Sequence, residues 1–274
     1  MKARARPLLG TFVEISIELE NCQSAMDEAF EAIQQVQDLM SFHDPLSELN
    51  QINRYAHIKP IDIHPWTAQV LRIAQDIYTQ SGGLFNCGIG HRLVEAGLLP
   101  RNIDVFNHSL GGIEDVQLIK PEKIQVSKPV CLDLGGIAKG FAVDKAVEVL
   151  IQNGVSSGCV NAGGDLRVFG NRPRPIQIRN PSSPQHLIDI GTLHNGAIAT
   201  SALYFAHRDR KPSHIINPMA KEANDIYFHF SESFSIIASE CVYADALTKV
   251  LALSKRPNHP CFDYFNAQAI KITA

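Results

Sequence analysis

The sequence contains no apolar run of the roughly 18 to 20 residues that a helix needs to cross a bilayer, so we expect no membrane span. It also lacks an excess of basic residues: the formal net charge is −3, which makes a nucleic acid an unexpected partner. Its 6 cysteines include no C-x-x-C pair. That spacing excludes an obvious zinc or redox motif and is typical of free thiols in a reducing compartment.

An export signal is also lacking. Residues 1–7 are basic like the start of a signal peptide, but Glu14 and Glu18 interrupt the apolar stretch that follows, and no small-residue cleavage site comes after it. We therefore expect a cytoplasmic protein. The chain has 274 residues and no internal repeat or low-complexity linker. This length suits one domain over residues 1–274, or two interleaved subdomains without a boundary visible in the sequence.

Hydrophobic periodicity predicts the secondary structure. Strands are expected at residues 11–19, 116–119, 123–126, 158–161, 166–169, 176–179, 187–193, 197–201, 214–216 and 234–239, with a final strand pair near 262–271. Helices are expected from Ser24 to Met40 and over residues 47–53, 65–79, 138–150 and 244–253. Helices segregated among antiparallel-looking strands favour an α+β fold, with mixed, mainly antiparallel sheets and packed helices.

The most informative segment is Cys131–Val143, where an apolar run breaks at Gly135-Gly136 and restarts as a helix with Lys139 in its first turn. Two glycines let the backbone approach a ligand closely, and a helix start offers free N–H groups with a partial positive charge. These features suit a phosphate or diphosphate. The alternatives are an ordinary strand–turn–helix joint and a solvated lysine.

Two further places could carry chemistry. Asp245 and Thr248 are three residues apart on an expected helix, so a carboxylate and a hydroxyl could reach one hard cation such as Mg²⁺. Alternatively, Asp245 complements the helix dipole and Thr248 faces solvent. His214 lies beside isoleucines, where a histidine is usually a hydrogen-bonded packing residue.

Motifs in the same order along nearly the whole chain closely resemble the ApbE family of FAD:protein FMN transferases. The segments that carry the resemblance are Leu9–Ile15, Met40–Phe42, Ser47–Asn50, Gly83–Phe85, Leu132–Asp144, Val160–Gly170, Ala199–Ser201, His214–Pro218 and Ala244–Thr248. The resemblance implies an ApbE-like fold with Mg²⁺ as cofactor and FAD as substrate. It also implies that Asp245, Thr248 and the backbone carbonyl of Ala138 bind the metal. His214 would lie in the active site with Asp245, where it would deprotonate an acceptor hydroxyl or orient the diphosphate.

The resemblance further implies a set of residues that contact FAD. They are Met40, Ser41, Ser47, Glu48, Phe85, Gly136, Lys139, Asp165, Thr200, Ser201 and His214. The residue types also permit simpler interpretations. Met40 could be the last core residue of its helix, Ser47 a helix N-cap and Asp165 a turn residue. Thr200 and Ser201 could be ordinary hydroxyls at a strand end.

The chain departs from the family pattern at several positions. The family usually places its threonine four residues after the aspartate, whereas Thr248 follows Asp245 by three. Asn217 stands where the family normally has aspartate, and Asn86-Cys87 where it favours Asp-Pro. Ala202 replaces a usual glycine. An asparagine can hydrogen-bond but cannot bring negative charge to a cation.

The implied reaction is the Mg²⁺-dependent transfer of FMN from FAD to a threonine or serine hydroxyl of an acceptor flavoprotein, a subunit of a redox protein, with release of AMP. Two alternatives belong to other classes. One is a Mg²⁺-dependent FAD pyrophosphatase, in which water replaces the acceptor hydroxyl. The other is a catalytically impaired FAD-binding protein, which the departures at Asn217, Asn86-Cys87 and Thr248 favour.

Overall fold

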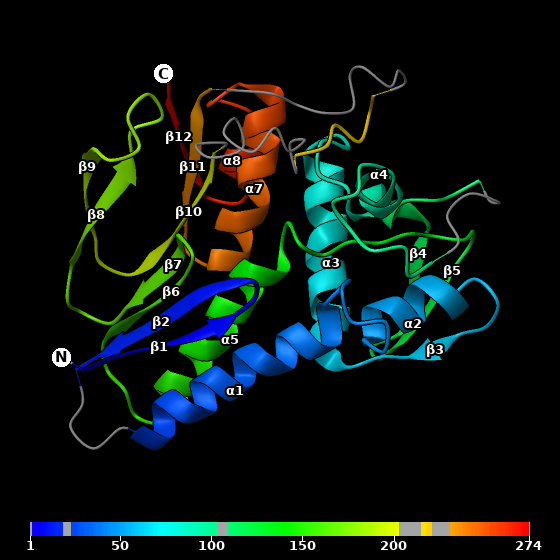
Figure 1. The fold of residues 1–274 in the computed structure, drawn as a ribbon, viewed down its shortest axis with the longest axis horizontal. Coiled ribbons are helices and arrows are strands. Elements are labelled where there is room, and N and C mark those ends of the chain that lie inside the picture. Colours follow the sequence, from blue (N-terminus) through cyan, green and yellow to red (C-terminus); the bar gives the residue numbers. More distant parts are fainter. Residues whose placement is uncertain (1, 19–22, 104–108, 203–214, 221–230, 274) are drawn as a thin grey trace.

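The computed structural model of the chain describes residues 2–18, 23–103, 109–202, 215–220 and 231–273. Its main sheet has seven strands in the order β1-β2-β6-β7-β10-β11-β12, and each pair of neighbours is antiparallel (Figure 1). The strands are β1 (Lys2–Leu8), β2 (Thr11–Ile17), β6 (Gly158–Ala162), β7 (Asp165–Phe169), β10 (Gly196–Ala202), β11 (Ser233–Ala238) and β12 (Gln268–Ile272).

Two tight turns set the register of this sheet. Leu9 and Gly10, between β1 and β2, have φ angles of 54° and 70°. Gly163 and Gly164, between β6 and β7, have φ angles of 66° and 107°. Two successive residues with positive φ suit the right-handed twist of a hairpin, and glycine adopts this conformation without steric cost. The second turn therefore fixes Asp165 as the first residue of β7.

Three long helices pack beside the main sheet: α1 (Gln23–Met40), α5 (Ala138–Gln152) and α7 (Cys241–Ser254). Helices α5 and α7 contact each other and lie on the same face of the sheet, and α1 packs along α5 (Figure 1). Most side chains of α5 and α7 are buried, because both helices are covered on one side by the sheet and on the other by further elements.

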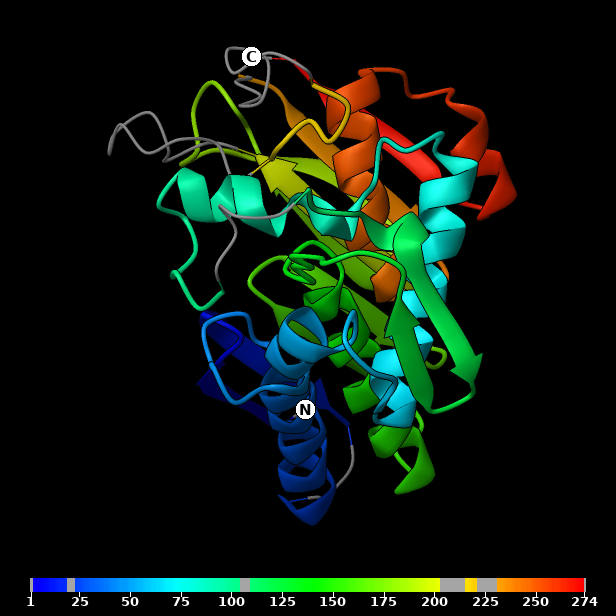
Figure 2. The same cartoon turned by 90° about the vertical axis from the view of Figure 1, so that its right-hand side faces the viewer.

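Those further elements form a smaller unit beyond the helices, which faces the viewer in Figure 2. It contains a three-stranded sheet in the order β3-β5-β4. Its elements are α2 (Glu48–Tyr55), β3 (Ile61–Asp62), α3 (Pro65–Gln80), the short 3-10 helices η1 (Cys87–Ile89) and η2 (Ile113–Asp115), α4 (Gly90–Glu95), β4 (Val116–Lys120) and β5 (Lys123–Val126). Helix α8 (Pro260–Tyr264) contacts both α3 and β12. On the opposite face of the main sheet, Ile176 of the hairpin β8 (Arg174–Arg179) and β9 (Leu187–Leu193) packs near Ile198.

The predicted α+β fold with mainly antiparallel sheets is confirmed. Three local predictions differ from the structure. The expected strand pair near 262–271 is wrong, because Pro260 begins helix α8 after His259, whose ring nitrogen accepts from the Cys261 N–H, and only β12 follows. Of the strand expected at 214–216, the described residues form no more than an isolated bridge at Ile216. His214 lies outside the described residues.

Strand β1 was not expected, because its basic residues resemble the start of a signal peptide. In the structure Arg4 and Arg6 both pair with Asp27 of α1, which explains how a charged segment forms an edge strand. Within the described part of the chain, no helix has the length and apolar character that crossing a bilayer demands.

Candidate active site

A cavity of about 830 Å³ opens between the main sheet, its helices and the smaller unit. This volume lies within the roughly 300 to 1,000 Å³ typical of small-molecule and cofactor sites. The cavity is lined by the β1–β2 turn, the end of α1, the segment before η1, the Gly135-Gly136 turn, the start of α5 and the end of β10. Segments from nearly the whole chain therefore meet there.

The lining combines apolar surface with a small group of charges. Phe42 and Phe85 contribute aromatic rings, and several leucines lie with them along the wall. Lys139, Lys249, Asp133 and Asp165 bring the ammonium and carboxyl groups. A cavity of this kind suits a ligand that has flat apolar rings as well as a strongly charged portion.

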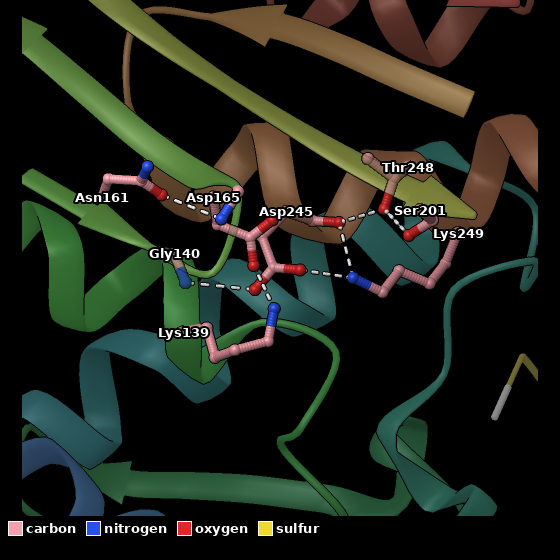
Figure 3. A network of polar contacts seen from close by, with 9 residues as sticks. Lys139, Gly140, Asn161, Asp165, Ser201, Asp245, Thr248 and Lys249 are labelled. Atoms are coloured by element: carbon pink, nitrogen blue, oxygen red, sulfur yellow. Dashed lines mark hydrogen bonds and ion pairs between the residues drawn. The ribbon is translucent and has the colours of Figure 1, made fainter. Parts of the chain in front are cut away.

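The charged group belongs to a connected network of polar contacts (Figure 3). The Lys139 ammonium donates to Asp165 Oδ2, and the Lys249 ammonium donates to Asp245 Oδ1. Lys249 Nζ also donates to the backbone carbonyl oxygen of Asp245 at 2.9 Å. The other carboxylate oxygen of Asp245 accepts the Gly140 N–H at 3.1 Å. Two carboxylates and two ammonium groups thus stand together at the cavity wall.

Burial and charge act in opposite directions on these groups. Burial raises the pKa of Asp245, but Lys139 and Lys249 together bring the pKa below its ordinary value. Burial and the nearby Asp245 charge raise the pKa of Asp165 despite the Lys139 ammonium. Burial lowers the pKa of Lys139, but the two carboxylates raise it above its ordinary value. Both Asp245 and Lys139 are therefore charged at neutral pH.

Helix α5 presents its first turn to the cavity. Its N-cap residue, Ile137, supplies no side-chain hydrogen bond to the helix, and Gly136, Ala138 and Lys139 all line the cavity. Asp245 takes over part of the capping role through the Gly140 N–H. A carboxylate near a helix N-terminus is favourable, because it offsets the partial positive charge there.

Most residues predicted to contact FAD lie at this cavity. Those lining it are Met40, Ser41, Phe85, Gly136, Lys139, Asp165, Thr200 and Ser201, together with Ala138, predicted as a metal ligand. Asp245 and Thr248 are completely buried and lie behind this lining rather than in it. His214 lies outside the described residues, so its predicted roles in proton transfer and FAD binding remain predictions.

Ser47 and Glu48 have structural contacts instead and do not line the cavity. Ser47 caps helix α2, since its Oγ accepts the Asn50 N–H at 3.2 Å. Glu48 Oε2 accepts the His64 N–H at 2.7 Å, just before α3 begins. Both side chains therefore position α2 and α3, as the N-cap interpretation of Ser47 predicts.

The residues that depart from the family pattern also have defined contacts. Asn86 caps η1, because its Oδ1 accepts the Gly88 N–H at 2.8 Å. Asn217 Oδ1 accepts the Met219 N–H at 3.0 Å, and Arg92 donates to the Asn217 carbonyl oxygen at 2.6 Å. Arg92 therefore holds residues 215–220 in place beside the cavity, which Ile216 helps to line.

The oxygens predicted to bind Mg²⁺ are already hydrogen-bonded within the protein. Both carboxylate oxygens of Asp245 have partners, and Thr248 Oγ1 donates to the Asp245 carbonyl at 2.7 Å and lies 2.8 Å from Ser201 Oγ. Mg²⁺ needs oxygen ligands about 2.1 Å away in near-octahedral geometry. The Lys249 ammonium touches the oxygen that would be the main ligand, so these residues do not fit the ion as they stand.

Sequence reasoning did not identify Lys249. The signal was present, because an aspartate and a lysine four residues apart on a helix are neighbours. Lys249 also occupies the position at which the family usually has its threonine, four residues after Asp245. Among the described residues, no group of three or more histidine, cysteine, aspartate or glutamate side chains is placed to hold a metal ion.

Comparisons with known proteins point to one family. A model of the ApbE family matches residues 9–259. The chain is 28% identical over 254 residues to a FAD:protein FMN transferase of Chlamydia trachomatis, covering 85% of this chain and 75% of that protein. It is 25% identical over 240 residues to a FAD:protein FMN transferase of Klebsiella pneumoniae, covering 81% of this chain and 73% of that protein.

Solved structures show the same fold. The flavin transferase ApbE from Vibrio cholerae superimposes with a TM-score of 0.82 and 23% identity, covering 99% of this chain and 93% of that chain. The ApbE protein from Thermotoga maritima gives a TM-score of 0.78 and 25% identity, covering 92% and 86%. The family match extends over most of the sequence, and its glycine-lysine segment lies at the cavity. This chain therefore belongs to the ApbE family.

Proposed function

We propose that this chain is a FAD:protein FMN transferase, which moves the FMN portion of FAD onto a threonine or serine hydroxyl of an acceptor flavoprotein and releases AMP. The family membership and the names of its relatives support the transferase activity. The observation that carries the proposal is the cavity, where Lys139 and the start of α5 meet an aromatic lining. This combination suits a flavin dinucleotide, which has a diphosphate between two ring systems.

The reaction forms one bond to phosphorus and breaks another. The acceptor hydroxyl oxygen attacks the phosphorus of the FMN portion, the hydroxyl proton passes to a base, and AMP leaves with the bridging oxygen. A lysine ammonium has three N–H donors, and Lys139 uses one of them on Asp165. Its other donors would stabilise the negative charge on the diphosphate. His214 is the predicted base.

The resemblance implies a Mg²⁺-dependent reaction, but we include no Mg²⁺ in this mechanism. Both carboxylate oxygens of Asp245 already accept hydrogen bonds, one from Gly140 and one from Lys249. A reducing compartment such as the cytoplasm is part of the proposal. It is supported by the cysteines that the structure describes, which are all free.

The activity is tested by mixing the purified chain with FAD, with and without a purified redox-protein domain that contains a candidate acceptor threonine. AMP formed only with the acceptor, together with a mass gain of the acceptor equal to FMN, is the expected result. AMP formed without the acceptor would identify a pyrophosphatase instead. FAD binding without AMP in either mixture would identify a binding protein and contradict transfer.

Replacing Lys139 with methionine is expected to weaken FAD binding by roughly 10- to 100-fold, since a charge-assisted hydrogen bond contributes about 1.5 to 3 kcal/mol. Methionine keeps the apolar stem but has no ammonium. Quenching of flavin fluorescence measures the affinity. Lys120→Met, on the exposed surface of β4, is the matched control and should leave the affinity unchanged. Equal affinities for the two variants would contradict the role of Lys139.

A further inference from the structure

Lys249 lies between the buried Asp245 and the Gly135-Gly136 turn. Its ammonium contacts both the side chain and the backbone carbonyl of Asp245, which anchors it from one side. Its stem passes close to the turn, because a Cβ built on Gly136 would lie 3.5 Å from Lys249 Cε. The side chain is 18% exposed and lines the cavity. A fixed positive charge is therefore presented next to the turn where the proposed diphosphate lies.

The ammonium has a donor left for a ligand. Of its three N–H groups, two are used on Asp245 Oδ1 and the Asp245 carbonyl oxygen. Both of these acceptors belong to one residue on the buried side. Because Lys249 lines the cavity, its third N–H can point toward a ligand there. Lys139 is arranged in the same way, with its ammonium anchored on Asp165.

A divalent ion and this ammonium compete for the same place. An ion bound at about 2.1 Å from Asp245 Oδ1 would stand where the Lys249 nitrogen now touches that oxygen. Thr248 offers no second ligand without giving up its contacts to Ser201 and to the Asp245 carbonyl.

We propose that the Lys249 ammonium, held in place by Asp245, takes the place of a divalent cation in this chain and binds the diphosphate of a flavin dinucleotide without metal. The inference rests on the proposed function, because it takes FAD as the ligand. Asp245 is then a positioning residue, which holds the lysine by charge and by its backbone carbonyl. Lys249 is the group that touches the substrate.

The unmodified protein gives the first test. FAD binding is measured by flavin fluorescence after dialysis against excess EDTA, and again with saturating Mg²⁺. We expect the two affinities to differ by less than about twofold, because the ammonium is part of the chain. Binding that requires Mg²⁺ would overturn the inference and leave the proposed function intact. No binding in either condition would overturn the proposed function itself.

Two variants of Lys249 distinguish the loss of the ammonium charge from the opening of room for an ion beside Asp245. Lys249→Met removes the ammonium but keeps a side chain of similar length, so FAD binding should fall by about 10-fold or more, and Mg²⁺ should not restore it. Lys249→Thr also removes the ammonium but frees Asp245 Oδ1 and the space beside it. We expect its FAD binding to be weak in EDTA and to recover when Mg²⁺ is added.

The exposed Lys59 provides a matched control, since Lys59→Met removes the same charge outside the cavity. It should bind FAD like the unmodified protein in both solutions. Circular dichroism establishes that each variant is folded before binding is measured. An unchanged affinity of Lys249→Met would overturn the inference, as would a Lys249→Thr variant that does not respond to Mg²⁺.

Discussion

Replacing Asp144 with alanine is expected to lower the free energy of unfolding by about 3 to 5 kcal/mol, the usual cost of removing one partner of a buried ion pair. Asp144 is buried on α5 and connects three elements. Its carboxylate accepts the N–H groups of Cys241 and Val242 at 2.9 and 2.8 Å, at the start of α7. It also accepts a hydrogen bond from Arg167 of β7 at 2.7 Å.

The carboxylate replaces a missing N-cap. Glu240, at the N-cap position of α7, makes no side-chain hydrogen bond to the helix. Asp144 instead accepts two of the N–H groups that the start of α7 leaves without partners inside the helix. Burial raises the pKa of Asp144 to about 6, although Arg167 and the two N–H groups lower it. The group is therefore ionised at neutral pH and pairs with the guanidinium of Arg167.

The measurement is thermal or urea unfolding at neutral pH. For a chain of this size, each kcal/mol corresponds to about 2 to 4 °C in Tm, so we expect a fall of roughly 10 °C. Asp144→Asn keeps one oxygen acceptor but loses the charge, and its loss of stability should be smaller. Alanine and asparagine variants as stable as the unmodified protein would show that this carboxylate does not hold α5, α7 and β7 together.

Replacing Gly140 with alanine should destabilise the protein by about 1 to 3 kcal/mol or more, even though alanine is the better helix former. A Cβ at this position would lie 2.2 Å from the Cys241 carbonyl oxygen and 2.8 Å from Asp245 Cβ. Helices α5 and α7 would have to move apart. The Gly140 N–H would then lose its contact with Asp245, so FAD binding should weaken as well.

Whether Gly140→Ala lowers or raises the free energy of unfolding shows whether helix packing or helix propensity dominates at this position. Helix propensity alone predicts that glycine to alanine stabilises an exposed helix by about 1 kcal/mol. Gln152→Ala, at the exposed end of the same helix, is the control and should change stability by less than about 0.5 kcal/mol. Urea unfolding and FAD titration of both variants measure the two effects. A Gly140→Ala variant that is as stable as the unmodified protein would contradict the close approach of α5 and α7.

The sequence determined much of the local structure, because local periodicity and turn chemistry carry it. The apolar spacing over residues 65–79 and 138–150 predicts helices that the structure contains as α3 and α5. The alternation from Thr11 onward predicts β2. These patterns fail at β1, a charged strand that depends on ion pairs with the distant Asp27. They also fail at α8, a helix of five residues that starts at Pro260 and is too short to show a helical period.

The sequence motifs also indicated the family and most of the residues at the cavity. Gly136 and Lys139 belong to one turn and helix start, and Asp165 follows a separate turn, yet the motifs that contain them point to one site. Ser47 and Glu48 lie outside the cavity lining, and their side chains hold the starts of α2 and α3. Their predicted contact with FAD stays a prediction.

Only the tertiary structure decided what Asp245 binds. From the sequence, its carboxylate could hold a metal ion or complement the dipole of its helix. Packing of α5 against α7 brings the Gly140 N–H to one oxygen, and the turn of α7 brings the Lys249 ammonium to the other. A buried carboxylate must be compensated by whichever positive groups the fold places beside it, and that placement depends on contacts between segments distant in the sequence.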